Sequence, residues 1–210
     1  MAELLFWFQL IMAYFYTVPL ITSVSQGQVK GLTLAMYVFF LAYLLLGFSL
    51  AVSAYKQGPA KNRDRLLTVI IFGNWLLLVG LITYFGCRFI PWRPSDSWFA
   101  IIIGSVTMLT IIKYRGVTDP LARGLIAVWC KAIPQLWLSY TLWQSHTGVN
   151  LKPWTVWAAN CTGIARLLQI VVIARKTGFD RPTRGLLLGE VANVVTWGVV
   201  TLVWLLLPKE

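Results

Sequence analysis

The chain has few residues of the kinds that build catalytic or metal centres: 1 histidine and 7 acidic residues among 210. The histidine, His146, falls in a predicted turn, so neither a histidine-based metal site nor a Ser–His–Asp triad can be assembled. No aspartate falls inside a predicted helix, and the last helix lacks the lysine that a retinal protein would need. The sequence therefore predicts no enzyme, no metal and no cofactor.

Cysteine is equally scarce. The 3 cysteines, Cys87, Cys130 and Cys161, share no ligand or redox spacing, and two of them fall inside apolar runs. We expect them to be small packing residues, with no disulfide framework.

Charge is also sparse, at 12% of residues, whereas 58% are hydrophobic and the mean hydropathy is +0.72. Runs of about 20 apolar residues are long enough to cross a bilayer as helices, and the connections leave no room for a soluble domain. The sequence predicts one all-α membrane domain over 1–210, with the lipid bilayer as its surroundings. The predicted spans are 4–24, 32–55, 66–86, 97–113, 122–145, 151–174 and 186–207.

The net charge of +11 comes from basic residues in short turns, which argues for a membrane orientation and against nucleic-acid binding. The connections after the second, fourth and sixth spans hold most of them. By the positive-inside rule these connections and the N-terminus lie in the cytoplasm, and we expect a multi-pass protein of the plasma (inner) membrane. The alternative is that these residues only contact lipid headgroups. They are Lys56, Lys61, Arg63, Arg65, Lys113, Arg115, Arg123, Arg175, Lys176, Arg181 and Arg184.

Two stretches of the chain repeat the same landmarks. A proline in the first helix, a glycine turn and an asparagine in the third helix recur 115 to 120 positions later, as in Pro19 and Pro134 or Asn74 and Asn193. Parallel repeats of this kind build one class of transporter. The pattern predicts triple-helix repeats at 4–86 and 122–207, joined by a linker helix at 97–113, which is a 3+1+3 arrangement.

One repeat carries a recognisable motif. Ala132-Ile133-Pro134-Gln135, followed by a glycine turn, resembles the proline–glutamine motif of the PQ-loop and SWEET (MtN3-like) sugar-transporter superfamily. The first copy reads Val18-Pro19-Leu20 and lacks the glutamine. The resemblance implies facilitated transport, often of sugars, and its relatives include amino-acid carriers and a retrieval-signal receptor. It also implies an outside N-terminus, in conflict with the charge distribution.

In SWEET-like proteins the third-helix asparagines of both halves face the substrate, a role that maps here onto Asn74 and Asn193. Each lies about eight residues into its span, roughly 12 Å deep at 1.5 Å per residue. An amide at that depth needs a partner or a wet cavity, and two facing amides can bind hydroxyl groups. The alternative is that they only join helices.

Ionisable residues gather in the second repeat. Lys131, Arg166 and Glu190 lie inside predicted spans, where charge requires pairing or hydration. Glu190 can neutralise one cation, so the sequence leaves open either a pocket for an anionic group or a structural ion pair with one snorkelling side chain. Glu190, Asn193 and Trp197 share a helix face, so we expect them, with Arg166, to shape the pocket.

The prolines Pro19 and Pro134 remove backbone donors inside helices, and we expect them, with Gln135, to act as hinges. Together these features predict a facilitative carrier of a small polar metabolite, most of all a sugar, that works by alternating access. Two alternatives stay open: an amino-acid or organic-acid carrier, and a non-transporting seven-helix receptor for a peptide signal. Association into homo-oligomers is also left open.

Overall fold

The computed structural model describes residues 2–57, 63–148 and 150–208, and every regular element within them is helical. A helix satisfies its own backbone hydrogen bonds, which a chain in hydrocarbon requires. Six of the helices are long and apolar enough to cross a membrane, so the predicted all-α membrane class is confirmed at that level. The elements are α1 (Ala2–Ser25), α2 (Leu34–Lys56), α3 (Arg63–Phe89), α4 (Pro94–Lys113), α5 (Pro120–Ala127), η1 (Val128–Ala132), α6 (Ile133–Ser145), α7 (Pro153–Thr177) and α8 (Arg181–Leu206).

The predicted span 122–145 is divided into three consecutive pieces, α5, η1 and α6. The middle piece is a π-helical turn, in which the Ile133 N–H donates to the carbonyl of Val128, five residues earlier. Pro134 follows directly and has no N–H to donate, so the wide turn lies where the regular α-helical ladder would be interrupted. Pro19 lies inside α1, which continues through it as one α-helix.

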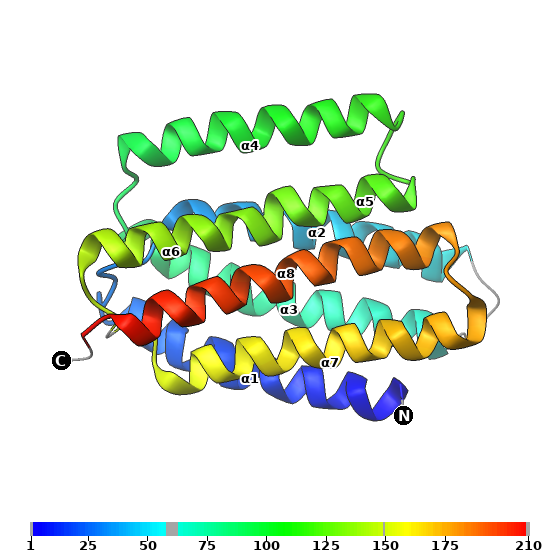
Figure 1. Cartoon of the computed structure of the whole chain (residues 1–210), viewed down its shortest axis with the longest axis horizontal. Helices are drawn as coiled ribbons and strands as arrows, with labels where there is room; N and C mark the ends of the chain where they lie inside the picture. The colour runs from blue at the N-terminus through cyan, green and yellow to red at the C-terminus, as the bar shows by residue number, and fades with distance from the viewer. Residues whose placement is uncertain (1, 58–62, 149, 209–210) are drawn as a thin grey trace.

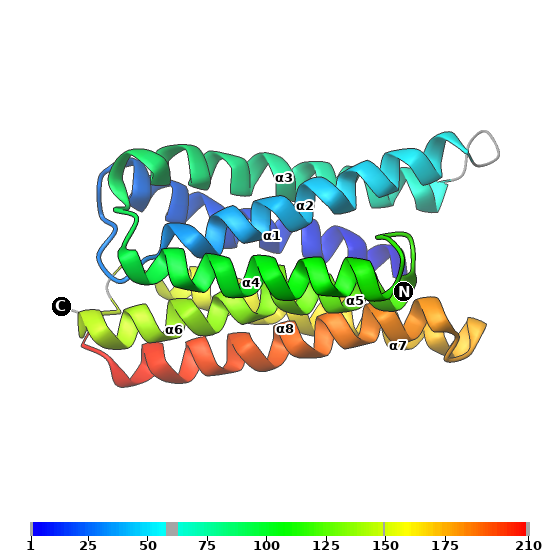
Figure 2. The same cartoon turned by 90° about the horizontal axis from the view of Figure 1, so that it is seen from above.

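Six helical columns form a closed ring, in the contact order α1, α3, α2, then α5 with η1 and α6, α8, α7 and back to α1. In Figure 2, α1 to α3 lie on one side and α5 to α8 on the other. We call α1–α3 the first half and α5–α8 the second half. Figure 1 shows α4 beside the ring, where it packs against α2, α5 and η1.

The two ends of the ring differ in their connections. We call the end where α2, α4 and α7 finish the basic end, because the basic connections of the sequence lie there. At the opposite end, the chain turns between α1 and α2, α3 and α4, and α6 and α7. The chain thus runs in the same direction through corresponding helices of the two halves.

The helix starts correct one prediction. Aspartates do occur in helices: α3 begins at Arg63 and includes Asp64, and α4 begins at Pro94 and includes Asp96. Both helices start three residues before the predicted apolar runs. In α4 the Arg93 N–H donates to Asp96 Oδ2 at 3.0 Å, a capping contact that a hydropathy window does not detect.

Candidate functional site

A cavity of about 770 Å³ lies inside the ring and is lined by all six columns, with no lining residue from the described part of α4. At the basic end it reaches Ala54, Arg63 and Asp64, which are exposed to solvent. Farther in, its lining includes Tyr16, whose ring lies 5.8 Å from that of Trp75 and 5.6 Å from that of Trp197. The described residues thus form a pocket that is open to solvent at the basic end.

Hydrogen bonds between the halves keep the opposite end closed. Thr141 of α6 donates to the carbonyl of Gly31 at 2.8 Å, and Asn150 donates to the carbonyl of Lys30 at 2.7 Å. A tightly packed apolar core, including Leu20, Leu32, Leu138 and Leu142, fills the space between the helices there.

Asp96 adds a further link at the closed end, where it is fully buried. Its Oδ1 accepts from Thr33 of the first half at 3.2 Å and from the indole of Trp137 of the second half at 2.7 Å. The start of α4 therefore joins both halves.

At the basic end the ion pairs lie within each half. Glu3 at the start of α1 pairs with Arg63 at the start of α3. Asp119 at the start of α5 pairs with Arg181 at the start of α8 at 2.6 Å. Equivalent positions in the two halves thus carry the same kind of pair, and none of the ion pairs of the described residues joins the halves there.

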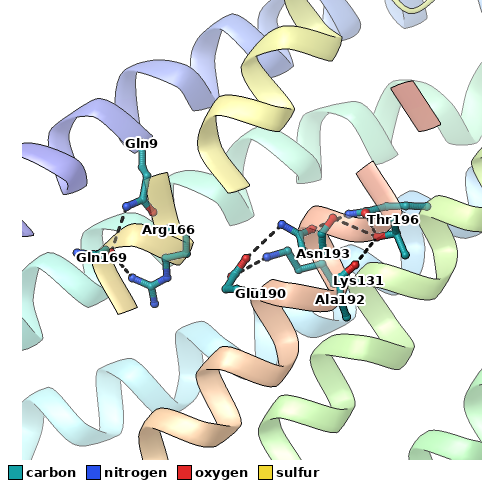
Figure 3. Close-up of polar contacts among 9 residues, drawn as sticks. Gln9, Lys131, Arg166, Gln169, Glu190, Ala192, Asn193 and Thr196 are labelled. Carbon is teal, nitrogen blue, oxygen red and sulfur yellow. Dashed lines mark hydrogen bonds and ion pairs between the residues drawn. The ribbon is translucent and has the colours of Figure 1, made fainter. Parts of the chain in front are cut away.

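The polar wall of the cavity belongs mainly to the second half. Lys131 Nζ lies 2.8 Å from Glu190 Oε1, and the Asn193 amide donates to Glu190 Oε2 at 3.2 Å. Gln135 donates to Asn193 Oδ1 at 2.8 Å and accepts from the hydroxyl of Thr196 at 2.5 Å. Figure 3 shows Lys131, Glu190, Asn193 and Thr196 converging at this point.

A second polar group in the cavity wall joins α7 to α1. Arg166 Nη1 donates to Gln169 Oε1 at 2.6 Å, and Gln9 donates to the same oxygen at 3.1 Å. Figure 3 shows these three side chains together, on the other side of Glu190 from Thr196. Gln9 and Gln169 were missed by the sequence reasoning, although an amide inside an apolar run is the same signal that selected the asparagines.

Four predicted pocket residues, Arg166, Glu190, Asn193 and Trp197, line the cavity. Gln135, predicted as a hinge residue, also lines it, whereas Pro19 and Pro134 do not.

The structure does not bring Asn74 and Asn193 together, which corrects the expectation that they face each other. Asn74 is not among the lining residues; its Oδ1 accepts from the exposed Tyr14 at 2.8 Å, between α1 and α3. Its neighbour Trp75 faces the cavity instead, and successive helical residues are turned by about 100°. Trp75 of α3 and Trp197 of α8 both contact Tyr16, so they are corresponding positions in the two halves. The residue four positions earlier is Ile71 in α3 and Asn193 in α8. An isoleucine thus occupies the place expected for the first asparagine.

These features define the class: a multi-pass helical membrane protein with a deep pocket between its helices. No protein-family model matches the chain, and neither a curated protein nor a solved structure matches it.

Proposed function

We propose that the chain is a facilitative carrier that moves a small metabolite across a membrane by alternating access between its two halves. The observation that supports it is the cavity, which is lined by both halves, is open at the basic end and contains Tyr16 and its aromatic neighbours in its inner part. Its volume of about 770 Å³ suits a small molecule. In this proposal the halves are the parallel bundles of a 3+1+3 carrier, with α4 as the linker.

The distribution of bonds supports a rocking motion. At the closed end the halves are joined by bonds such as Thr141 to Gly31, whereas at the basic end the ion pairs lie within each half. Rocking would break the former, open the opposite end and close the basic end while each half keeps its own pairs. The π-helical turn before Pro134 is the bending point that we assign to the second half.

Distance measurements on spin labels test the motion without a known substrate. Labels at the exposed Gln28 and Lys152 report on the closed end, after the three native cysteines are replaced. A carrier gives a second, longer distance population in lipid nanodiscs, which becomes larger when a screened metabolite favours the open state. A single narrow distance under all conditions, including a screen of metabolites, contradicts alternating access.

Counterflow in liposomes tests the predicted sugar substrate, with radiolabelled glucose as the probe. If the unmodified chain exchanges glucose, Asn193→Ala should abolish that exchange, because Asn193 lines the cavity and connects Gln135 with Glu190. Asn74→Ala is the matched control, since Asn74 is an amide of a third helix outside the cavity lining. Equal loss in both variants contradicts the site assignment, and binding without exchange would favour the receptor alternative.

A further inference from the structure

We infer that the cavity selects an organic anion that has one carboxylate and a compact apolar, preferably aromatic, body. The inference rests on the proposed function, whose substrate class it names. Three properties of the cavity carry it: a cation outside the ion pairs of the described residues, a carboxylate that already has a paired lysine, and an aromatic wall opposite the polar one.

Arg166 is the cation. It lines the cavity, is only half-buried, and donates to the neutral amide of Gln169. Among the described residues, no ion pair includes it. A guanidinium has five N–H donors in a planar fork, and the hydrogen bond to Gln169 is made from Nη1. A ligand carboxylate fits the geometry of that fork.

Glu190 does not cancel this charge, because Lys131 neutralises it. Their side chains are 13% and 14% exposed, and the atoms that pair lie 2.8 Å apart. The second carboxylate oxygen of Glu190 accepts from Asn193 at 3.2 Å. The inner cavity therefore keeps a surplus of one positive charge, which an anionic ligand neutralises and a sugar does not.

The same pairing argues against an amino acid. An α-ammonium group would need an anionic partner in the inner cavity, and Glu190 is the carboxylate there among the described lining residues. That carboxylate already binds Lys131 and Asn193. A carboxylate without an ammonium group therefore fits better than a zwitterion.

The wall from the first half is aromatic. The rings of Trp75, Phe40, Tyr43 and Phe72 form a chain in that order, and the centroids of successive rings lie 6.1 to 6.5 Å apart. Gly47 makes room for Phe72, since a Cβ at Gly47 would lie 2.2 Å from the Phe72 ring. These rings offer an apolar surface to the body of a ligand and few groups to the hydroxyls of a sugar.

Binding to the purified chain in nanodiscs, measured by calorimetry, tests the inference separately from transport. The probe is 3-phenylpropionate; its comparisons are 3-phenylpropionamide, acetate, phenylalanine and glucose. We expect the carboxylate to bind at least about tenfold more tightly than the amide, the effect of one charge-assisted hydrogen bond. Acetate, which lacks the apolar body, should bind more weakly still.

The Arg166→Gln variant should lower affinity for 3-phenylpropionate by about tenfold or more, and Arg166→Lys, which keeps the charge but loses the planar fork, should retain only part of it. Arg175→Gln is the matched control, because Arg175 is on the same helix, exposed and outside the cavity lining. If Arg166→Gln fails to fold, the comparison of carboxylate with amide on the unmodified chain decides alone.

Equal binding of carboxylate and amide, tighter binding of phenylalanine or glucose, or a folded Arg166→Gln variant with unchanged affinity overturns the inference. Binding of 3-phenylpropionate without counterflow in liposomes keeps the ligand class and refutes the carrier. Counterflow of glucose with no binding of the carboxylate keeps the carrier and refutes the ligand class.

Discussion

The contact between α5 and α8 at the mouth of the cavity is a close approach of two backbones, and it depends on glycine. A Cβ at Gly185 would lie 2.1 Å from the carbonyl oxygen of Pro120, and one at Gly124 would lie 2.3 Å from the carbonyl oxygen of Gly185. Gly185 and Gly189 are four residues apart in α8, the small-residue spacing that lets membrane helices approach. We therefore expect Gly185→Ala to force α5 away from α8.

The size of the effect follows from what the new methyl group meets. At Gly185 the obstacle is backbone, which no rotamer change relieves, so we expect overpacking to cost about 1–3 kcal/mol or more, offset by at most about 1 kcal/mol of helix propensity. At Gly198, also inside α8, a Cβ meets nothing within 4 Å, so Gly198→Ala keeps only the gain.

Thermal unfolding in detergent measures both variants under the same conditions. The midpoint of Gly185→Ala should fall below that of the unmodified chain, while Gly198→Ala should match or exceed it. Gly124→Ala, on the other side of the contact, should behave like Gly185→Ala. If Gly185→Ala unfolds at or above the midpoint of Gly198→Ala, the close backbone approach of α5 and α8 is refuted.

Two further predictions concern charge. Glu190→Gln leaves Lys131 buried without its carboxylate and should lower stability by about 3 kcal/mol, whereas the double variant with Lys131→Gln should recover most of the loss; denaturant unfolding measures both, and equal stability of single and double variants contradicts the pair. Burial opposes ionisation of Asp119, but two backbone N–H groups of α5 and the Arg181 guanidinium outweigh it and hold the pKa of Asp119 below its ordinary value of 3.8. The ionised Asp119 carboxylate therefore stabilises the fold fully above the ordinary pKa, and this stabilisation is lost as pH falls through the lowered pKa. In Asp119→Asn the unfolding midpoint should decrease less between about pH 5 and pH 2 than in the unmodified chain. The same decrease in both proteins contradicts this role of Asp119.

Hydropathy alone predicted the helices well. Each predicted apolar run overlaps a helix of the structure, because a long uncharged stretch has few other ways to satisfy its backbone in lipid. The starts of α3 and α4 were missed, since polar and charged residues such as Asp64 and Asp96 occupy the first turns. The π-helical turn was also missed; proline indicates that a helix is disturbed but not how the backbone accommodates it.

Which side chains share the cavity was only partly predictable. Polar residues in apolar runs identified Asn193, Glu190 and Arg166 correctly as cavity-lining. Asn74 failed because the repeat was aligned by residue type, and an error of one residue turns a helix face by about 100°. The aromatic wall of the first half carried no sequence signal, since aromatic residues are common throughout the chain.

The hydrogen bonds of the loop before α2 affect how often the closed end opens in the absence of a ligand. Lys30 and Gly31 accept hydrogen bonds from Asn150 and Thr141, and Thr33 reaches Asp96, so three bonds meet on four consecutive residues. At about 1 kcal/mol each, releasing them together costs about 3 kcal/mol, so the proposed carrier would have roughly one unliganded molecule in a hundred open on that side. In the proposed carrier, at equal concentrations on both sides, substrate therefore binds more often from the basic end than from the closed end, although net transport is zero.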